Sequence, residues 1–280
     1  MKKALALIAA LMVACLAFTG CGGDQSKSSG SGSGAAASSG GKTLKIGATA
    51  VPHAEILEIV KPILKDDGID LEIVEFSDYV QPNLALNDKE LDANFFQHAP
   101  YLENFISEHK DCKLANVAGI HIEPMGIYSK KIKDIKELKD GATIAIPNDP
   151  TNEGRSLLLL EKAGILKLKN GVAEKATIQD IAENPKNIKF QEVEAAQVPR
   201  TLEDVDAAVI NTNYAMQVNL VPTKDALFIE DSTSPYVNII AVRQGDENRP
   251  EIQALIKALK SDKMKEFIND KYKGAVVPAF

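Results

Sequence analysis

The stretch from Leu44 to Phe76, LKIGATAVPHAEILEIVKPILKDDGIDLEIVEF, decides the fold class of this chain. Its first part, Leu44–Thr49, alternates in polarity and then reaches small residues, which predicts a strand that ends in a loop. Apolar side chains then recur at helical spacing from Ile56 to Leu64, and Asp66-Asp67-Gly68 ends this predicted helix. Ile69–Phe76 is a second predicted strand. A strand, a helix and another strand in succession are typical of an α/β protein.

The same alternation of strands and helices continues to the end of the chain. Further strands are predicted at Asp92–Phe96, Met125–Ser129, Thr143–Pro147, Ile188–Val193, Ala207–Asn211 and Asn238–Val242. Further helices are predicted at Val80–Asp88, Tyr101–His109, Ile135–Leu138, Asn152–Ala163, Val198–Asp204, Pro250–Lys260 and Lys263–Tyr272. We therefore expect an α/β fold with mostly parallel sheets.

The chain is long enough for two lobes with a ligand cleft between them. We expect the extended runs Ile122–Ser129 and Ser234–Val242 to cross between the lobes and to act as two hinge strands. Residues 43–125 and 238–280 would then form lobe 1, and residues 126–237 would form lobe 2.

The N-terminus has the three parts of an export signal. Lys2 and Lys3 are followed by an apolar run to Phe18, which is too short to span a bilayer comfortably. The sequence Phe18-Thr19-Gly20-Cys21 resembles a bacterial lipobox, with phenylalanine where leucine is usual. We therefore predict a signal peptide at 1–20 and a lipid on Cys21; the alternative is a plain signal peptide and an incidental cysteine. Residues 21–42 would form the lipidated end and a flexible Gly/Ser linker.

The composition excludes several classes of protein. A formal net charge of −7 argues against nucleic-acid binding, which usually needs a basic surface. After Cys21 no apolar run reaches the length of a membrane span. Once Cys15 leaves with the signal and Cys21 carries lipid, Cys112 is the remaining cysteine, so we expect no internal disulfide.

Catalytic motifs are missing from the sequence. It contains no G-x-S-x-G, P-loop, H-E-x-x-H or G-x-G-x-x-G pattern, so we expect neither an enzyme nor a bound cofactor. Cys112 and His109 could form a nucleophile pair, but a cysteine in a polar loop at a helix end is the simpler interpretation. The histidines are scattered along the chain at 53, 98, 109 and 121, so no metal site is expected.

Polar and aromatic residues gather where predicted strands end. The four segments are Ser77–Tyr79, Asn94–Tyr101, Pro147–Arg155 and Asn211–Tyr214. Ligands of open α/β sheets bind beyond the carboxyl ends of the strands, so these segments are expected to converge on one cleft. Each alone could be an ordinary turn, and Asp149 or Thr151 could simply cap a helix.

Together these segments resemble the methionine-binding lipoproteins, the NlpA-type solute-binding family of ABC importers. The resemblance extends over essentially everything after the linker, and it rests on these matching stretches: Pro52–Leu57, Phe76–Val80, Asp92–His98 with Pro100-Tyr101, Ile127–Lys131, Ile146–Asn152 with Gly154–Leu157, Val209–Thr212 and Ser234–Asn238.

The resemblance implies a two-lobed, periplasmic-binding-protein-like (type II) fold that holds an amino acid between its lobes. Arg155 would pair two-pronged with the α-carboxylate, and Asn148 and Asn211 would bind the carboxylate and the α-amino group. Four side chains would wall an apolar slot for a thioether: Tyr79, Phe96, His98 and Tyr101. His53 and Gln97 are weaker candidates that could merely brace the loops.

The ligand implied is L-methionine, D-methionine or a methionine-containing dipeptide. The partners implied are a membrane permease and its ATPase subunit, with the chain held on the extracytoplasmic side of the membrane through the lipid on Cys21. Two alternatives stay open at this stage: a metal-binding (zinc-type) solute-binding lipoprotein, and a lipoprotein with an enzymatic or adhesive role on the same scaffold.

Overall fold

The structure is a computed structural model that describes residues 42–231 and 233–280. The predicted signal peptide, Cys21 and the linker up to residue 41 lie outside the described residues. Within the described ranges, no helix combines the length and the apolar character that crossing a membrane requires.

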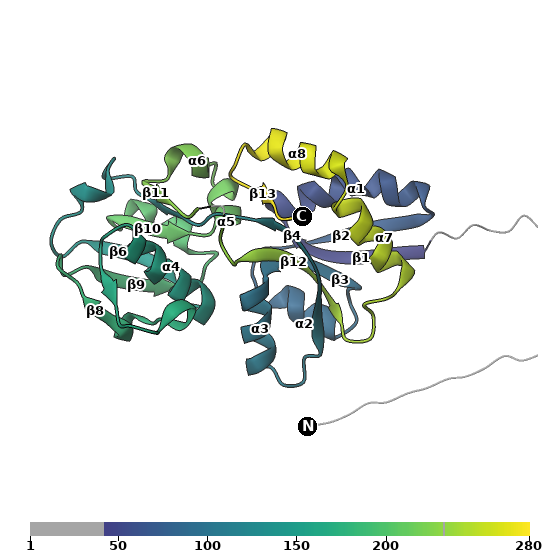
Figure 1. Cartoon of the computed structure of the whole chain (residues 1–280), viewed down its shortest axis with the longest axis horizontal. Coiled ribbons are helices and arrows are strands. Elements are labelled where there is room, and N and C mark those ends of the chain that lie inside the picture. The colour runs from purple at the N-terminus through teal and green to yellow at the C-terminus, as the bar shows by residue number, and fades with distance from the viewer. Residues whose placement is uncertain (1–41, 232) are drawn as a thin grey trace, which may run out of the picture. The chain divides into compact units, whose positions relative to one another are not determined.

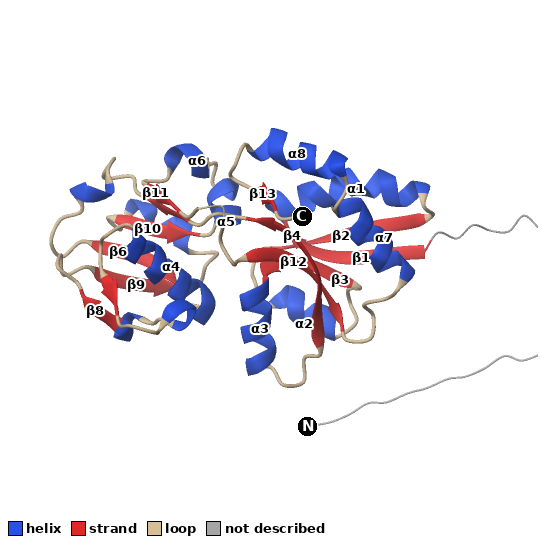
Figure 2. Ribbon diagram, in the orientation of Figure 1, coloured by secondary structure: helices blue, strands red, loops and turns tan. Residues whose placement is uncertain are grey.

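The first of two large sheets has six strands (Figures 1 and 2). In sheet order they are β13 (Val277–Pro278), β4 (Leu114–Ile122), β12 (Val237–Arg243), β3 (Ala93–His98), β1 (Lys42–Thr49) and β2 (Ile69–Phe76). β1 pairs in parallel with β2 and β3, whereas β12, β4 and β13 continue the sheet in antiparallel pairings. The sheet is therefore mixed, and the expectation of mostly parallel sheets is wrong.

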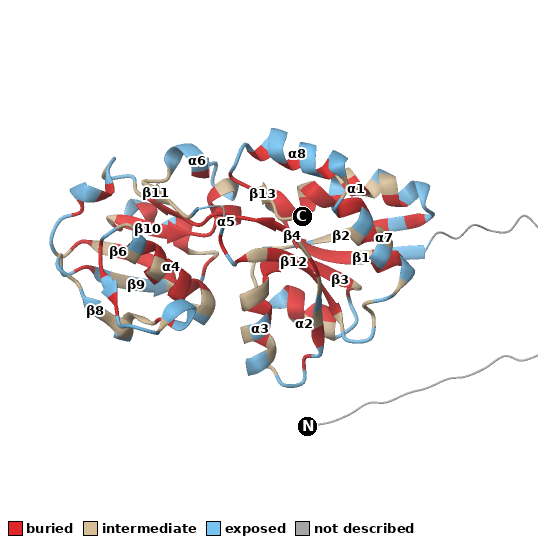
Figure 3. Cartoon of the chain, viewed as in Figure 1, coloured by how far each residue is buried: buried red, intermediate tan, exposed pale blue. Residues whose placement is uncertain are grey.

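Helices cover both faces of this sheet. They are α1 (Glu55–Asp66), α2 (Gln81–Asn87), α3 (Ala99–Glu108), α7 (Pro250–Leu259) and α8 (Asp262–Tyr272). Successive residues of β12 face opposite layers: Ile240 packs with α1, α7 and α8, while Ile239 packs with α2 and α3. Figure 3 shows the outer side of α8 exposed, whereas β3 and most of β12 in the sheet are buried. This sheet and its five helices are called the six-stranded lobe below.

The second large sheet has five strands and is also mixed. In sheet order they are β11 (Phe228–Ile229), β5 (Gly126–Tyr128), β10 (Ala207–Ile210), β6 (Thr143–Pro147) and β9 (Lys189–Val193). β6 pairs in parallel with β9 and β10, and β5 pairs antiparallel with β10 and β11. In β10, Val209 packs on one face of the sheet and Ile210 on the other.

Three α-helices and several short elements complete the second lobe. The helices are α4 (Pro150–Lys162), α5 (Thr212–Gln217) and α6 (Pro222–Asp225), and a small sheet pairs β7 (Lys167–Leu168) with β8 (Ile181–Glu183). The 3₁₀ turns are η2 (Ile135–Glu137), η3 (Ala173–Lys175), η4 (Ile178–Asp180) and η5 (Val198–Glu203). These elements and the five-stranded sheet are called the five-stranded lobe below.

Two stretches of chain join the lobes. Residues 123–125 connect β4 to β5, and residues 230–236 connect β11 to β12. Both lie within or beside the runs that we expected to cross, 122–129 and 234–242. The lobe boundaries predicted from the sequence, at 125/126 and 237/238, stay a prediction.

One further turn lies at the edge of the six-stranded lobe. η1 (Ala50–Ala54) follows β1 directly and leads into α1. It carries His53, which is fully buried. The loop after a parallel strand therefore brings a titratable side chain to the centre of the molecule.

Candidate functional site

A small cavity lies where the two lobes meet. It is lined by Tyr79, Phe96, Gln97, His98, Tyr101, Glu123, Asn152, Arg155, Asn211, Thr212, Asn213 and Asn238. Six of the seven ligand-binding residues predicted from the sequence are in this set: Tyr79, Phe96, His98, Tyr101, Arg155 and Asn211. The ends of β2, β3 and β10 and the first turns of α4 position them, as expected for loops beyond strand ends.

Asn148, the seventh predicted residue, does not line this cavity. Its side chain is exposed and borders a neighbouring groove, which it shares with Tyr79 and Tyr101. The backbone N–H of Asn148 still donates to the Val193 carbonyl at 2.9 Å, so the chain continues the ladder of β6 with β9 for one more residue. That pairing leaves the Asn148 side chain outside the cavity.

Arg155 is buried, and its charge is already paired within the protein. Its Nε and Nη2 donate to the two carboxylate oxygens of Glu230 at 3.2 and 2.5 Å. Nη2 also donates to the Glu123 carbonyl at 2.8 Å. The two-pronged pair expected with a ligand is therefore made with Glu230, and Nη1 is the guanidinium nitrogen without a hydrogen bond to the described residues.

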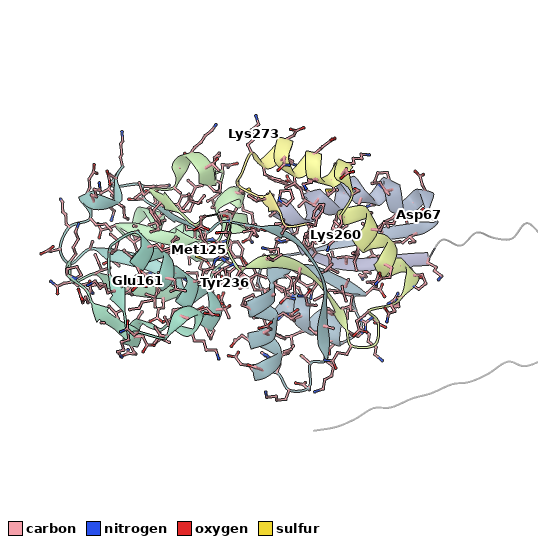
Figure 4. The ribbon with its side chains drawn as sticks, in the orientation of Figure 1. Asp67, Met125, Glu161, Tyr236, Lys260 and Lys273 are labelled. Atoms are coloured by element: carbon pink, nitrogen blue, oxygen red, sulfur yellow. The ribbon has the colours of Figure 1, made fainter. Side chains whose placement is uncertain are left out.

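Tyr236 forms a flat support beneath Arg155. The guanidinium carbon lies 4.3 Å from the centre of the Tyr236 ring, which is a cation–π contact. The imidazole of His98 approaches the same ring at 5.0 Å. In Figure 4 the labelled Tyr236 lies between the ribbons of the two lobes. Because the ring holds the guanidinium from below, Arg155 has a fixed orientation.

His98 is a neutral imidazole with a defined tautomer. Its Nδ1 accepts the Tyr101 backbone N–H at 3.1 Å, so the proton is on Nε2, which donates to Asn152 Oδ1 at 3.2 Å. Burial, and next the Arg155 charge, lower the pKa of His98 to about 3. His98 therefore contributes a ring and one N–H donor to the cavity and no charge.

Amide side chains supply the remaining polar groups of the cavity. Asn211 Nδ2 donates to Asn152 Oδ1 at 2.8 Å, and Tyr79 donates its hydroxyl to Asn213 Oδ1 at 2.6 Å. Asn211 Oδ1 and Asn213 Nδ2 are buried and have no hydrogen-bond partner among residues 42–231 and 233–280. The cavity therefore presents one unpaired acceptor and one unpaired donor, which a ligand can satisfy.

Aromatic rings cluster on the other side of the cavity. The Tyr79 ring lies 5.9 Å from Phe96, 5.7 Å from Tyr101 and 4.9 Å from Tyr214, measured between ring centres. Burial raises the pKa of the Tyr79 hydroxyl well above its ordinary value, so it stays protonated as a donor. These rings include three of the four residues that were predicted to wall an apolar slot, and Tyr214 lies beside them in the neighbouring groove.

Gln97 belongs to a buried network of amides behind the cavity. It exchanges hydrogen bonds with Asn83 at 2.7 and 2.9 Å and donates to Asn94 at 2.9 Å. Its position supports the interpretation that it braces the loops of the six-stranded lobe, although it also lines the cavity.

His53 does not line the cavity but contacts residues that do. Its Nε2 lies 3.2 Å from Glu123 Oε1 and 3.0 Å from Asn238 Oδ1, and its Nδ1 lies 2.7 Å from the Thr49 hydroxyl. His121 Nε2 lies 2.8 Å from the same Glu123 oxygen. The two histidines are therefore neighbours, and the expectation of scattered histidines is wrong for this pair.

His53, His121 and Glu123 place three potential metal-ligating atoms within 4.8 Å of one another. Burial lowers the pKa of His53 to about 4 and that of His121 to about 3, and burial raises the pKa of Glu123. A metal-ligating histidine normally donates its second N–H to a partner, but His121 Nδ1 has none within the described chain. The donor set therefore fits a hydrogen-bonded cluster better than a metal site.

Several cavity residues were not predicted from the sequence. Glu123 lies on a stretch that joins the lobes, as do Glu230 and Tyr236, which contact Arg155 without lining the cavity. No strand-end pattern singles out these three positions. Asn152 and Asn238 are within stretches that carried the family resemblance, and Asn213 is within the polar segment Asn211–Tyr214, but none of the three was selected.

The chain is similar to known proteins over most of its length. A family model described as NlpA lipoprotein matches residues 44–280. The methionine-binding lipoprotein MetQ of Bacillus subtilis (strain 168) is 48% identical over 246 residues, which cover 86% of this chain and 90% of that protein. The D-methionine-binding lipoprotein MetQ of Escherichia coli (strain K12) is 42% identical over 278 residues, covering 98% and 97% of the two chains.

Solved structures show the same fold. A nutrient binding protein from Burkholderia cenocepacia, bound to methionine, matches this chain with a TM-score of 0.82 and 49% sequence identity. The match covers 85% of this chain and all of that one, 100%. The two-lobed, periplasmic-binding-protein-like α/β fold expected from the sequence is therefore confirmed.

Proposed function

The chain belongs to the NlpA lipoprotein family, and from that premise we propose that it captures methionine and delivers it to an ABC importer. The family is one of substrate-binding proteins. The absence of enzymatic activity stays a prediction. The zinc-type alternative is not supported, since the relatives described above are named for methionine.

The observation that carries the proposal is the pair of unsatisfied amide atoms in the cavity. Asn211 Oδ1 is a buried acceptor that suits an α-ammonium, and Asn213 Nδ2 is a buried donor that suits an α-carboxylate. Arg155 Nη1 is a second donor for the carboxylate. A buried polar atom without a partner costs free energy, so a zwitterion that satisfies both atoms gains affinity from groups the empty site leaves unpaired.

Charge balance favours a zwitterion over a simple anion. The charge of Arg155 is already neutralised by Glu230, and Glu123 adds a carboxylate at the cavity. A ligand that carried a carboxylate but no ammonium group would be repelled by the Glu123 carboxylate. An amino acid brings both charges, so each end finds a complementary group.

The apolar end of the ligand would lie against the rings. Phe96, Tyr79 and Tyr101 form a wall of aromatic faces and edges. A thioether is polarizable and gains about 0.3–1.5 kcal/mol beside an aromatic ring. This contact favours methionine over a branched aliphatic side chain of similar size.

Closure of the lobes would accompany binding. Contacts across the cavity include Tyr79 with Asn213 at 2.6 Å and the Tyr214 hydroxyl with the Ser77 carbonyl at 3.2 Å. Each joins the six-stranded lobe to α5 of the five-stranded lobe. Rotation about the two joining stretches would break these hydrogen bonds and open the site.

Delivery requires a location outside the cytoplasm. The relatives are lipoproteins, which implies an extracytoplasmic chain. We further propose that the lipid is on Cys21 and that a permease and its ATPase subunit receive the ligand. Mass spectrometry of the N-terminal peptide checks the first point, since an unlipidated Cys21 peptide from membrane fractions would contradict it.

Thermal unfolding of the chain without its signal peptide tests the ligand. L-methionine at millimolar concentration should raise the Tm by several degrees if the Kd is micromolar or tighter. D-methionine and Gly-Met, tested in parallel, rank the three ligand forms. Mass spectrometry of natively purified protein identifies any ligand it retains. No Tm shift with any of the three compounds would contradict the proposal.

A further inference from the structure

A chain of side-chain hydrogen bonds leads from Asp149 to the cavity. Asn152 Nδ2 donates to both carboxylate oxygens of Asp149, at 3.0 and 2.9 Å. Asn152 Oδ1 in turn accepts from Asn211 Nδ2 at 2.8 Å. Asn211 Oδ1 is the end of this chain, and it is the buried acceptor that lacks a partner in the described residues. Asp149 itself does not line the cavity.

The direction of this chain is set by the Asp149 carboxylate, whose oxygens accept from the Thr151 hydroxyl and from the backbone N–H and Nδ2 of Asn152. An ionised carboxylate only accepts hydrogen bonds, so the amide of Asn152 must turn its Nδ2 toward Asp149. The Asn152 Oδ1 then points toward Asn211, whose amide must answer with its own Nδ2. The remaining atom of Asn211, its Oδ1, is thereby directed into the cavity.

His98 reinforces the same direction from the other lobe. Its Nδ1 is occupied as an acceptor by the Tyr101 backbone N–H, so its Nε2 carries the proton and needs an acceptor. Asn152 Oδ1 is that acceptor, at 3.2 Å. A reversed Asn152 amide would place its N–H donor against the Nε2–H donor of His98. It would also place its carbonyl oxygen against the Asp149 carboxylate, where two acceptors would face each other.

We propose that Asp149 is a positioning residue that fixes the direction of the Asn152 and Asn211 amides, so that Asn211 presents an acceptor to the ligand's α-ammonium. The inference rests on the proposed function, because it assumes that the ligand carries an ammonium group. Reversal of the two amides would present an N–H donor to the ammonium and would exchange an attraction for a repulsion.

The orientation of the Asn213 amide, in contrast, is not fixed by a carboxylate. Its Oδ1 faces the Tyr79 hydroxyl, a group that can either donate or accept. The Asn213 amide could therefore reverse if the hydroxyl rotated. The amide of Asn152 has no such freedom, because Asp149 offers acceptors alone.

Asp149 also caps a helix, and the test must distinguish this structural role from the positioning of the two amides. Its side chain accepts the Asn152 backbone N–H at 3.0 Å and caps the N-terminus of α4. Serine caps helices about as well as aspartate, so Asp149→Ser keeps a capping group. The substitution replaces the carboxylate, which only accepts hydrogen bonds, with a hydroxyl, which can both donate and accept. Asp134, which caps η2 in the same way, offers the matched control Asp134→Ser.

The test compares L-methionine with 4-(methylthio)butanoate, which has the same carboxylate and thioether but no ammonium. Calorimetric titration of Asp149→Ser should show methionine affinity reduced about tenfold or more. Affinity for the analogue should change by less than about threefold, since that ligand makes no bond to Asn211. Asp134→Ser should bind both ligands as the unmodified chain does.

Coupling between the two residues gives the second readout. If Asp149 acts through Asn211, the double variant Asp149→Ser with Asn211→Ala should bind methionine no more weakly than Asn211→Ala alone. Additive losses in the double variant would overturn the proposal. Equal losses for methionine and the analogue in Asp149→Ser would overturn it as well.

Two further outcomes have definite meanings. If Asp149→Ser does not fold, Asp149→Asn replaces it, because asparagine keeps the cap and the shape and can face Asn152 with either amide atom. If the unmodified chain binds neither compound, the proposed function and this inference are both wrong. If it binds methionine and the variants fail the comparison, the role of Asp149 alone is wrong.

Discussion

The two sides of the cavity carry different chemistry. The six-stranded lobe contributes four uncharged rings, Tyr79, Phe96, His98 and Tyr101, together with the amides of Gln97 and Asn238. The five-stranded lobe contributes Asn152, Arg155, Asn211, Thr212 and Asn213, which are polar or charged. The rings can bind any apolar side chain, and the polar wall can bind any amino-acid backbone. Under the proposed function, selection for both features in one ligand would require the two lobes to meet.

Of the variants considered, Arg155→Ala should have the largest effect on both stability and methionine affinity. Removal of the guanidinium leaves Glu230 buried without its partner, which costs about 3–5 kcal/mol of the free energy of unfolding. Methionine affinity should fall about a hundredfold or more as a charged donor is lost. Chemical denaturation and calorimetric titration measure the two effects.

The pair Arg155→Met with Glu230→Gln serves as its control. This double variant removes both charges, so stability should largely return while methionine affinity stays low. Full methionine affinity in either variant would show that the polar side of the cavity has been misassigned.

Acid should weaken the six-stranded lobe through its buried histidines. The pKa of His53 is lowered from 6.5 to about 4, and the pKa values of His98 and His121 to about 3. Between pH 6.5 and these values the unfolded chain binds more protons than the folded chain, so the free energy of unfolding falls as the pH falls. At pH 5 each fully buried histidine should cost about 2 kcal/mol.

Urea denaturation at several pH values measures this dependence. The raised pKa of Glu123 acts in the opposite direction, since its folded form holds a proton more readily than the unfolded form. The variant His98→Gln should have a shallower decrease below pH 6.5 than the unmodified chain. Unfolding free energies that do not change between pH 7 and pH 5 would contradict the assignment of neutral buried imidazoles.

Tyr79→Phe tests how much the hydrogen bond between the two lobes contributes to methionine affinity. It removes one hydroxyl that bridges the lobes to Asn213 and keeps the ring. A neutral hydrogen bond contributes about 1 kcal/mol, so methionine affinity should fall about fivefold. In Tyr101→Phe the lost hydroxyl bonds to the Tyr79 carbonyl in the same lobe. The Tyr101→Phe control should bind methionine more tightly than Tyr79→Phe does. Equal affinities would contradict the idea that Tyr79→Phe loses affinity by weakening closure.

Asn148→Ala should have the smallest effect. Its side chain is exposed in the neighbouring groove and touches neither wall of the cavity. Methionine affinity should change by less than about twofold, as for surface substitutions in general. Asn211→Ala, measured in the same titration, should lose much more. A loss at Asn148 comparable to that at Asn211 would return Asn148 to the binding site.

Local patterns predicted most elements and failed at particular ones. β1, β2, β6 and β12 lie where alternation or apolar runs placed them, and Asp149 caps α4 as one interpretation of its position allowed. β4, with the sequence LANVAGIHI, was missed because Asn116 and Gly119 interrupt its pattern. It forms because it pairs with β12 along nearly its whole length and with β13 at its end. Sheet position overrides weak strand propensity here.

The candidate site divides in the same way. Residues at strand ends, such as Tyr79, His98 and Asn211, were identified because the parallel strands bring their loops to one edge of each sheet. Asn148 follows β6 directly but borders the neighbouring groove and does not line the cavity, so its ligand-binding role stays a prediction. Glu230 was missed because nothing near it in the sequence indicates a partner 75 residues away.

The sequence alone determined the α/β class, the family and the set of loops that meet at the cavity, because hydrophobic periodicity and short motifs are local properties of a chain. The tertiary structure alone decided which atoms of those loops are free to meet a ligand. Arg155 binds Glu230 and Asn152 Oδ1 accepts from Asn211, so among the described residues Asn211 Oδ1 and Asn213 Nδ2 are left without a partner. These contacts join residues 75 and 59 positions apart in the chain, and no local pattern encodes such a pairing.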